Sequence, residues 1–281
     1  MNLSGKTYIL SLADGENWQF ASDDGAADWL ERFASTMMLE PGASADSPRI
    51  IFTRNGHKKG WRKRDLGSIG FWTHHKSRDV FCSLGDEETR ELDIVRMWLS
   101  LNPVYERAIN SGGVPMHSAL VERGSLGVLL AAAGDTGKST CCKRIPPPWR
   151  GVCDDETLVV RAGEGIYRAH PFPTWSNYIF EREEAPWPAG EDVPVNAVFF
   201  LRQSPEDRVE PVGEGRAAML INDSASQVMR RILRRLERCE ETALRKKVFE
   251  NACRLASSAP AFVLHVSVHG RFWEKIDGAL R

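Results

Sequence analysis

The stretch LGVLLAAAGDTGKST, from Leu126 to Thr140, decides the fold. Its apolar and small residues from Leu126 to Ala132 predict a strand. A glycine-rich loop follows, and we expect a helix from Gly137 to Ile145 that ends before the prolines of 146–148. A strand, a glycine-rich loop and a helix in this order are typical of a phosphate-binding loop.

The residue types of this loop are the ones that phosphate binding requires. Small residues allow backbone N–H groups to approach a phosphate closely, and the start of a helix adds partial positive charge. Lys138 is expected to reach the β- and γ-phosphates, and the Ser139 hydroxyl to bind Mg²⁺. The predicted ligands of ATP are Gly134, Asp135, Thr136, Gly137, Lys138, Ser139 and Thr140.

One loop position departs from the general pattern G-x-x-x-x-G-K-[ST], which has glycine where this chain has Ala132. Alanine is the mildest replacement, and Gly134 would supply flexibility further along the loop. The alternative is a Gly-Lys-Ser-Thr sequence that occurs in a turn by chance. The apolar strand before it and the helix after it favour phosphate binding.

Two adjacent carboxylates, Asp154 and Asp155, follow the loop helix after a short connection. In phosphoryl transfer, a carboxylate beside the γ-phosphate holds Mg²⁺ or deprotonates the attacking hydroxyl. Because neighbouring strand residues point to opposite faces, we expect only one of the pair to face the nucleotide. Asp154 is the predicted base, and Asp155 is a predicted Mg²⁺ ligand with Ser139. The alternative is a turn-forming aspartate pair.

His117 lies on a predicted strand, Met116 to Glu122, which a turn at Gly124-Ser125 joins to the strand before the loop. This hairpin could bring His117 beside Asp154 and the phosphates. We therefore count His117 among the candidate catalytic residues, although a strand histidine is more often a satisfied structural residue.

The elements His117-Ser118, Gly137-Lys138-Ser139 and Cys153-Asp154-Asp155 resemble, in this order, the catalytic domain of HPr kinase/phosphorylase. That domain belongs to the phosphoenolpyruvate-carboxykinase-like P-loop group, and the resemblance covers residues 112–280. It implies an ATP- and Mg²⁺-dependent kinase that phosphorylates a Ser or Thr hydroxyl of a small protein or peptide.

Two further stretches, CCKRIPPPW from Cys141 and HPFPTWS from His170, resemble the SynChlorMet cassette protein ScmC. Such HPr-kinase-like proteins are encoded with ribosomally made, modified peptides, and related members act on lasso-peptide precursors. The resemblance therefore implies a precursor peptide as the acceptor.

Two elements of the HPr kinase family are missing from the sequence: Glu-x-Arg-Gly-x-Gly after the acidic pair and Arg-Pro-Gly-Arg-Asn near the C-terminus. One Mg²⁺ ligand is thus unassigned, with Glu181, Glu183 and Glu184 nearby. HPr as substrate is in doubt, and a non-catalytic ATP-binding scaffold or regulator of peptide maturation is the alternative function. A motor-type ATPase fits poorly, because no obvious hydrophobic strand ends in an acidic residue.

The sequence pattern changes at Ser111-Gly112-Gly113, which predicts a boundary. Residues 1–110 are expected to form a small α/β region, and 111–281 a nucleotide-binding domain. Hairpins mixed with a strand-loop-helix unit favour α/β with a mixed sheet over a regular doubly wound sheet. The predicted strands are 7–12, 49–53, 79–83, 116–122, 126–132, 157–161, 166–170, 195–202 and 261–268, and the predicted helices begin after 22 and cover 87–101, 137–145 and 224–255.

Composition indicates an ordinary globular protein of 281 residues, with 42% hydrophobic residues and a net charge of -1. A net charge close to zero argues against nucleic acid or a membrane as a partner. The sequence leaves a homo-oligomer possible. No apolar run is long enough to span a bilayer, and we see no signal peptide. The six cysteines form no Cys-x-x-Cys pair, which argues against zinc and favours a reducing cytoplasm.

Three other features have two possible interpretations each. The basic run His57 to Arg64 could dock an acidic leader peptide or nucleic acid, but a solvated loop is favoured. The segment His170 to Trp175 could cover a base or a peptide, or could be a packed connection. The arginines of the C-terminal helical stretch are expected to form a charged solvent face: Arg230, Arg231, Arg234, Arg235 and Arg238.

Overall fold

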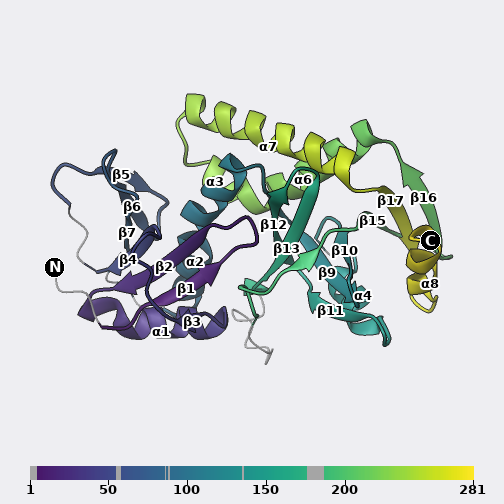
Figure 1. Ribbon diagram of the computed structural model, residues 1–281, viewed down its shortest axis with the longest axis horizontal. Helices are drawn as coiled ribbons and strands as arrows, with labels where there is room; N and C mark the ends of the chain where they lie inside the picture. The colour runs from purple at the N-terminus through teal and green to yellow at the C-terminus, as the bar shows by residue number, and fades with distance from the viewer. Residues whose placement is uncertain (1–4, 55–57, 86, 88, 135, 176–186) are drawn as a thin grey trace. The chain divides into compact units, whose positions relative to one another are not determined.

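The computed structural model describes residues 5–54, 58–85, 87, 89–134, 136–175 and 187–281. It has a mixed α/β fold (Figure 1), as predicted. The chain divides into two compact units. One contains Met1–Arg107, Pro173–Glu191 and Arg231–Leu236, and the other contains Ala108–Phe172, Asp192–Arg230 and Glu237–Arg281. The proposal that 1–110 and 111–281 are separate folding domains stays a prediction.

The first unit contains a seven-stranded mixed sheet with the order β3-β1-β2-β4-β7-β6-β5. The central strands β2, β4 and β7 run parallel, and the other pairs are antiparallel. The strands are β1 (Tyr8–Ser11), β2 (Asn17–Ser22), β3 (Glu40–Pro41), β4 (Arg49–Thr53), β5 (Arg62–Asp65), β6 (Gly70–Thr73) and β7 (Val80–Ser83), and the helices are η1 (Asp24–Ala26), α1 (Ala27–Thr36), α2 (Arg90–Ser100) and α3 (Asn102–Asn110), of which α3 continues into the second unit.

Apolar periodicity correctly predicted α1, which buries Trp29, Leu30 and Phe33 on one face, with Met37 buried at its end. Pro103 lies in the first turn of α3, where its missing N–H removes no helical hydrogen bond.

The second unit contains two sheets. The six-stranded sheet has the order β11-β9-β10-β15-β17-β16, and the four-stranded sheet has the order β14-β13-β12-β8. The strands are β8 (Val114–Met116), β9 (Ser118–Arg123), β10 (Leu126–Ala131), β11 (Arg150–Cys153), β12 (Glu156–Gly163), β13 (Ile166–Phe172), β14 (Val193–Pro194), β15 (Ala197–Gln203), β16 (Arg208–Val212) and β17 (Ala261–Val266), and the helices are α4 (Lys138–Arg144), α6 (Glu214–Leu233), α7 (Arg238–Ser258) and α8 (Phe272–Ala279).

The core of this unit lies around β10, which pairs with β9 on one side and runs parallel to β15 on the other. Its side chains Val128 and Leu130 are fully buried in a cluster with Phe199, Leu264 and Phe272. The strand that leads into the glycine-rich loop is therefore held rigidly from both sides.

The predicted single strand from Met116 to Glu122 is wrong. Strand β8 ends at Met116 and pairs with β12, whereas β9 begins at Ser118 and pairs with β10. His117 lies between them, where the chain passes from one sheet to the other. Most residues of both strands are buried, so the sequence lacks the apolar–polar alternation that would reveal the change of sheet.

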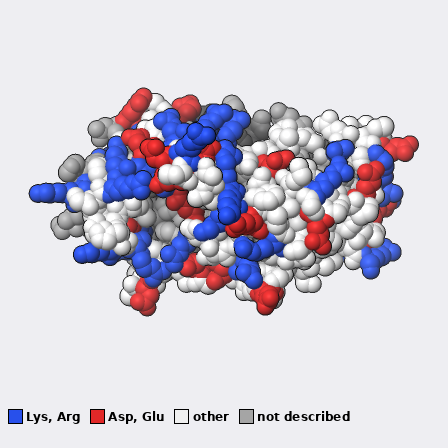
Figure 2. Space-filling view, turned by 90° about the horizontal axis from the view of Figure 1, so that it is seen from above, with Lys and Arg blue, Asp and Glu red and all other residues white. Residues whose placement is uncertain are grey.

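The predicted helical stretch from Ser224 to Leu255 also needed correction, because it consists of two helices, α6 and α7, with a break at 234–237. All five arginines expected on its solvent face are exposed. Figure 2 shows Lys and Arg next to Asp and Glu across one face of the molecule, so no single sign of charge dominates that face. None of the helices described is long and apolar enough to span a membrane.

Candidate functional site

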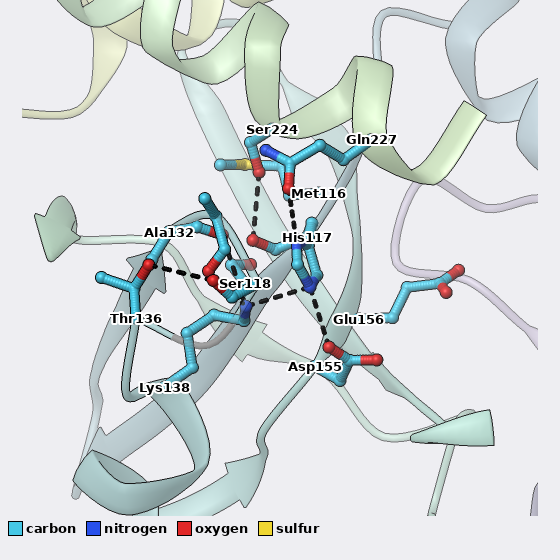
Figure 3. A network of polar contacts seen from close by, with 12 residues as sticks. Met116, His117, Ser118, Ala132, Thr136, Lys138, Asp155, Glu156, Ser224 and Gln227 are labelled. Carbon is cyan, nitrogen blue, oxygen red and sulfur yellow. Dashed lines mark hydrogen bonds and ion pairs between the residues drawn. The ribbon is translucent and has the colours of Figure 1, made fainter. Parts of the chain in front are cut away.

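The glycine-rich loop connects β10 to α4 as predicted (Figure 3). Gly137 caps α4 with a φ of 109°, in the left-handed region that favours glycine. The Thr136 hydroxyl lies 3.4 Å from the carbonyl oxygen of Gly134, and Ser139 and Thr140 are exposed. Asp135, the remaining predicted loop ligand, lies outside the described residues.

Lys138 is the best-buried charged residue of the loop, with 5% of its surface exposed. Its Nζ lies 3.3 Å from the carbonyl oxygen of Ala132 and 3.5 Å from that of Ala133. The same atom lies 2.9 Å from Nε2 of His117. The amino group therefore turns back over the loop rather than out to solvent.

Helix α6 holds His117 through two contacts. The Ser224 hydroxyl donates to the carbonyl oxygen of His117 at 3.2 Å, and Nδ1 of the ring lies 2.7 Å from Oε1 of Gln227. The Gln227 amide nitrogen donates to the carbonyl oxygen of Asp223 at 3.4 Å, which orients its oxygen toward the ring. Because an amide oxygen only accepts, this arrangement assigns the hydrogen to Nδ1.

The other ring nitrogen, Nε2 of His117, has two possible partners. It lies 2.9 Å from Nζ of Lys138 and 2.9 Å from Oδ1 of Asp155. Without a hydrogen, Nε2 accepts from the ammonium; with a hydrogen, it donates to the carboxylate. A change in the protonation of His117 would therefore exchange its partner.

Asp155 is the carboxylate of the acidic pair that contacts His117 (Figure 3). Burial acts to raise the pKa of this carboxyl, but the hydrogen bond with His117 and the charges of His117 and Lys138 outweigh it and lower the pKa below its usual value. The ionised form is thus favoured in the folded protein.

Asp154 and Asp155 lie in the bend between β11 and β12, not on a strand, so strand alternation does not decide where they point. Asp154 lies close enough to Cys142 to affect it: burial raises the pKa of the Cys142 thiol, and the Asp154 charge raises it further. The structure thus brings together Lys138, His117 and Asp155. The role of Asp154 as base stays a prediction.

No sequence pattern indicates Ser224 and Gln227, which lie 107 and 110 residues beyond His117. None indicates the contact between the buried hydroxyls of Ser118 and Thr157, which joins β9 to β12 next to His117. Glu156 is the third acidic residue in a row. Its side chain is buried and points away from the His117 ring.

A cavity of about 220 Å³ opens next to these residues. Its walls come from the carboxyl ends of β10 and β15, from β17, and from one face of α6. The lining residues are Ala131, Ala132, Ala133, Phe200, Leu201, Arg202, Leu220, Asp223, Ser224, Gln227 and Val263. Arg202 is at the position near the end of β15 where a motor-type ATPase would carry its acidic residue.

The segment His170 to Trp175 is buried at every position. His170 and Phe172 lie on β13, as expected for a packed connection. The three glutamates near position 181 lie in the part that is not described, as does His57 of the basic run. Within the described ranges, no group of three or more His, Cys, Asp or Glu residues could hold a metal ion.

The family model described as SynChlorMet cassette protein ScmC matches residues 80–281, which is well over half of the 281-residue chain. No curated protein matches the sequence. The match includes the glycine-rich loop, His117, the acidic pair and α6. The chain therefore belongs to the family of the SynChlorMet cassette protein ScmC.

Proposed function

We propose that this protein is a kinase-like enzyme that binds ATP at the loop Gly134 to Thr140 and transfers its γ-phosphate to a Ser or Thr hydroxyl of a peptide. The observation that carries the proposal is the buried Lys138 amino group, which lies between two loop carbonyls and His117. This amino group follows a strand-loop-helix connection capped by Gly137, and the Asp155 carboxylate contacts the same ring nitrogen of His117 as Lys138 does.

The position of Lys138 supports phosphate binding on energetic grounds. A buried ammonium is costly unless it has hydrogen-bond acceptors, and the two loop carbonyls that contact Lys138 are neutral. Phosphate oxygens are charged acceptors, which adds the attraction of opposite charges to the hydrogen bond. A triphosphate in the loop would therefore attract the amino group more strongly than the carbonyls do.

The proposed reaction needs few groups. The acceptor oxygen bonds to the γ-phosphorus as the bond from that phosphorus to the bridging oxygen of ADP breaks, and the hydroxyl proton passes to a carboxylate. We assign the proton to Asp154. Asp155 and Lys138 would hold His117 in place, and Lys138 would also contact the phosphates.

The loop residues fit Mg²⁺, which prefers oxygen ligands and commonly uses one or two protein groups together with substrate phosphates. The Ser139 hydroxyl and the Asp155 carboxylate would be those groups. When bound, the ion neutralises charge on the phosphates. The six cysteines are free thiols, which supports a reducing cytoplasm as the location.

We also propose that the second unit has the P-loop fold of HPr kinase. The order and proximity of His117, the loop and the acidic pair support this relationship. The two missing family elements exclude HPr itself and the reverse phosphorylase activity from the proposal. A precursor peptide is the proposed acceptor, in keeping with the peptide-modification setting that the sequence resemblance implies.

A non-catalytic ATP-binding scaffold is the second candidate. Ala132 in place of glycine, and the missing Glu-x-Arg-Gly-x-Gly element, favour it. The retained Lys138, Asp154 and Asp155 favour the enzyme. Both candidates require nucleotide binding, so they are separated by phosphate transfer and not by affinity.

Calorimetric titration with MgATP tests the shared requirement. Lys138→Ala should remove most of the affinity and leave the fold intact. Lys143→Ala is the matched control, because Lys143 is exposed on the same helix, and it should bind as the wild type does. Equal MgATP binding by the wild type and Lys138→Ala would show that the loop is not the phosphate site.

A further inference from the structure

We propose that the 220 Å³ cavity beside the loop receives the acceptor side chain, a Ser or Thr residue of the peptide. This inference rests on the proposed kinase function and adds a site for the second substrate. The loop and the acidic pair account for the nucleotide, but they leave the position of the hydroxyl group undefined.

The position of the cavity in the fold favours a substrate site. Strands β10 and β15 are parallel, and the cavity lies where both end. In open α/β sheets, ligands bind outside the carboxyl ends of parallel strands. The opposite wall is α6, which contributes Leu220, Asp223, Ser224 and Gln227 at the spacing of one helix face.

The walls of the cavity are the same residues that hold the candidate catalytic groups. Ala132 and Ala133 line it, and their carbonyl oxygens contact Nζ of Lys138. Gln227 lines it and contacts the His117 ring. An acceptor group in the cavity would therefore contact residues that themselves contact the Lys138 ammonium, which would hold the γ-phosphate, and the His117 imidazole beside Asp155.

The size of the cavity favours a single side chain over a larger ligand. Pockets for drug-sized ligands measure about 300–1,000 Å³, and 220 Å³ lies below that range. The lining is chemically mixed: Phe200, Leu220 and Val263 are apolar, whereas Asp223 and Gln227 supply polar groups. A hydroxyl on a short aliphatic side chain matches this lining.

The test uses the full-length protein with its Leu, Val and Ala methyl groups isotopically labelled for NMR. The probe is N-acetyl-threonine N-methylamide, titrated with MgADP present. We expect this threonine probe to shift the methyl signals of Ala132, Leu220 and Val263.

Leu220→Trp fills the cavity and should weaken binding of the threonine probe by at least about tenfold, because the indole occupies the space. Met219→Trp is the matched control: Met219 is the preceding residue of α6 but is 61% exposed. It should bind the probe as the wild type does. Both variants should retain MgATP binding by calorimetry, which separates this inference from the nucleotide site.

Three outcomes would overturn the inference. The first is that the threonine probe fails to shift the cavity signals of the wild type. The second is that it binds Leu220→Trp as well as it binds the wild type. The third is that MgADP displaces it from the wild type. The last result would give the cavity to the nucleotide. If MgATP itself does not bind, the proposed function fails, and the NMR titration without nucleotide still reports on the cavity.

Discussion

Replacing each carboxylate of the acidic pair by asparagine separates the roles of Asp154 and Asp155. Asparagine keeps the size and removes the charge. Asp154→Asn should bind MgATP normally, whereas phosphate transfer to the acceptor peptide should fall by about two to four powers of ten, the usual contribution of a general base. Asp155→Asn should lower both transfer and stability, because Asp155 holds the His117 ring.

The size of the stability effect follows from the contact. The Asp155 carboxylate lies 2.9 Å from Nε2 of His117, with 35% of the side chain exposed. A hydrogen bond to a charged group contributes about 1.5–3 kcal/mol and a neutral one about 0.5–1.5 kcal/mol. The difference is about 1 kcal/mol, and solvent screening of a partly exposed pair places the expected loss at or below that value.

Chemical denaturation and a labelled-phosphate assay measure the two effects. Asp277→Asn is the control, because Asp277 on α8 accepts from Trp149 and pairs with Arg123 at 2.7 Å. That variant should lose stability and keep its transfer activity. A fully active Asp154→Asn together with an inactive Asp155→Asn would refute the assignment and exchange the two roles.

Three further predictions concern stability and packing. The lowered pKa of Asp155 means that its contribution to stability is present at neutral pH and is lost as pH falls below about 4, the unfolded value, so denaturation curves of wild type and Asp155→Asn should converge in acid. Gly127→Ala should destabilise the protein by about 1–3 kcal/mol, since its methyl group would overlap a carbonyl oxygen of β14. Gly215→Ala on α6 is the control, because there is open space around that position, and it should not destabilise the protein. Equal melting temperatures for the two variants would contradict this packing. Ellman's reagent should modify Cys239 and Cys253 quickly and the other four thiols slowly, because only these two are exposed and burial raises the pKa of the rest; more than two fast thiols would contradict the fold.

The loop was predictable because its signal is local. An apolar strand, glycines at turning positions and a following helix lie within one stretch, and the structure has all three between Leu126 and Arg144. The predicted hairpin would bring His117 beside Asp154, but in the structure Asp155 contacts the ring. The sequence could not indicate which carboxylate makes the contact, because that depends on the bend between β11 and β12.

The remainder of the site depends on contacts between distant segments. Gln227 comes from a helix whose start was placed at Ser224 instead of Glu214, and nothing in its local sequence relates it to a histidine 110 residues earlier. The change of sheet at His117 could not be predicted from the sequence pattern. Both flanking strands are largely buried, so neither shows the alternation of apolar and polar residues that marks one strand from the next.

Transfer of labelled γ-phosphate from ATP tests the central claim most directly. The wild type is incubated with Mg²⁺, the labelled nucleotide and the precursor peptides encoded beside its gene, with ATP hydrolysis measured in parallel. The proposed function predicts label on a Ser or Thr residue of one peptide, which Lys143→Ala retains and Lys138→Ala loses. A wild type that binds MgATP but transfers label to none of these peptides would contradict the kinase proposal and favour the scaffold.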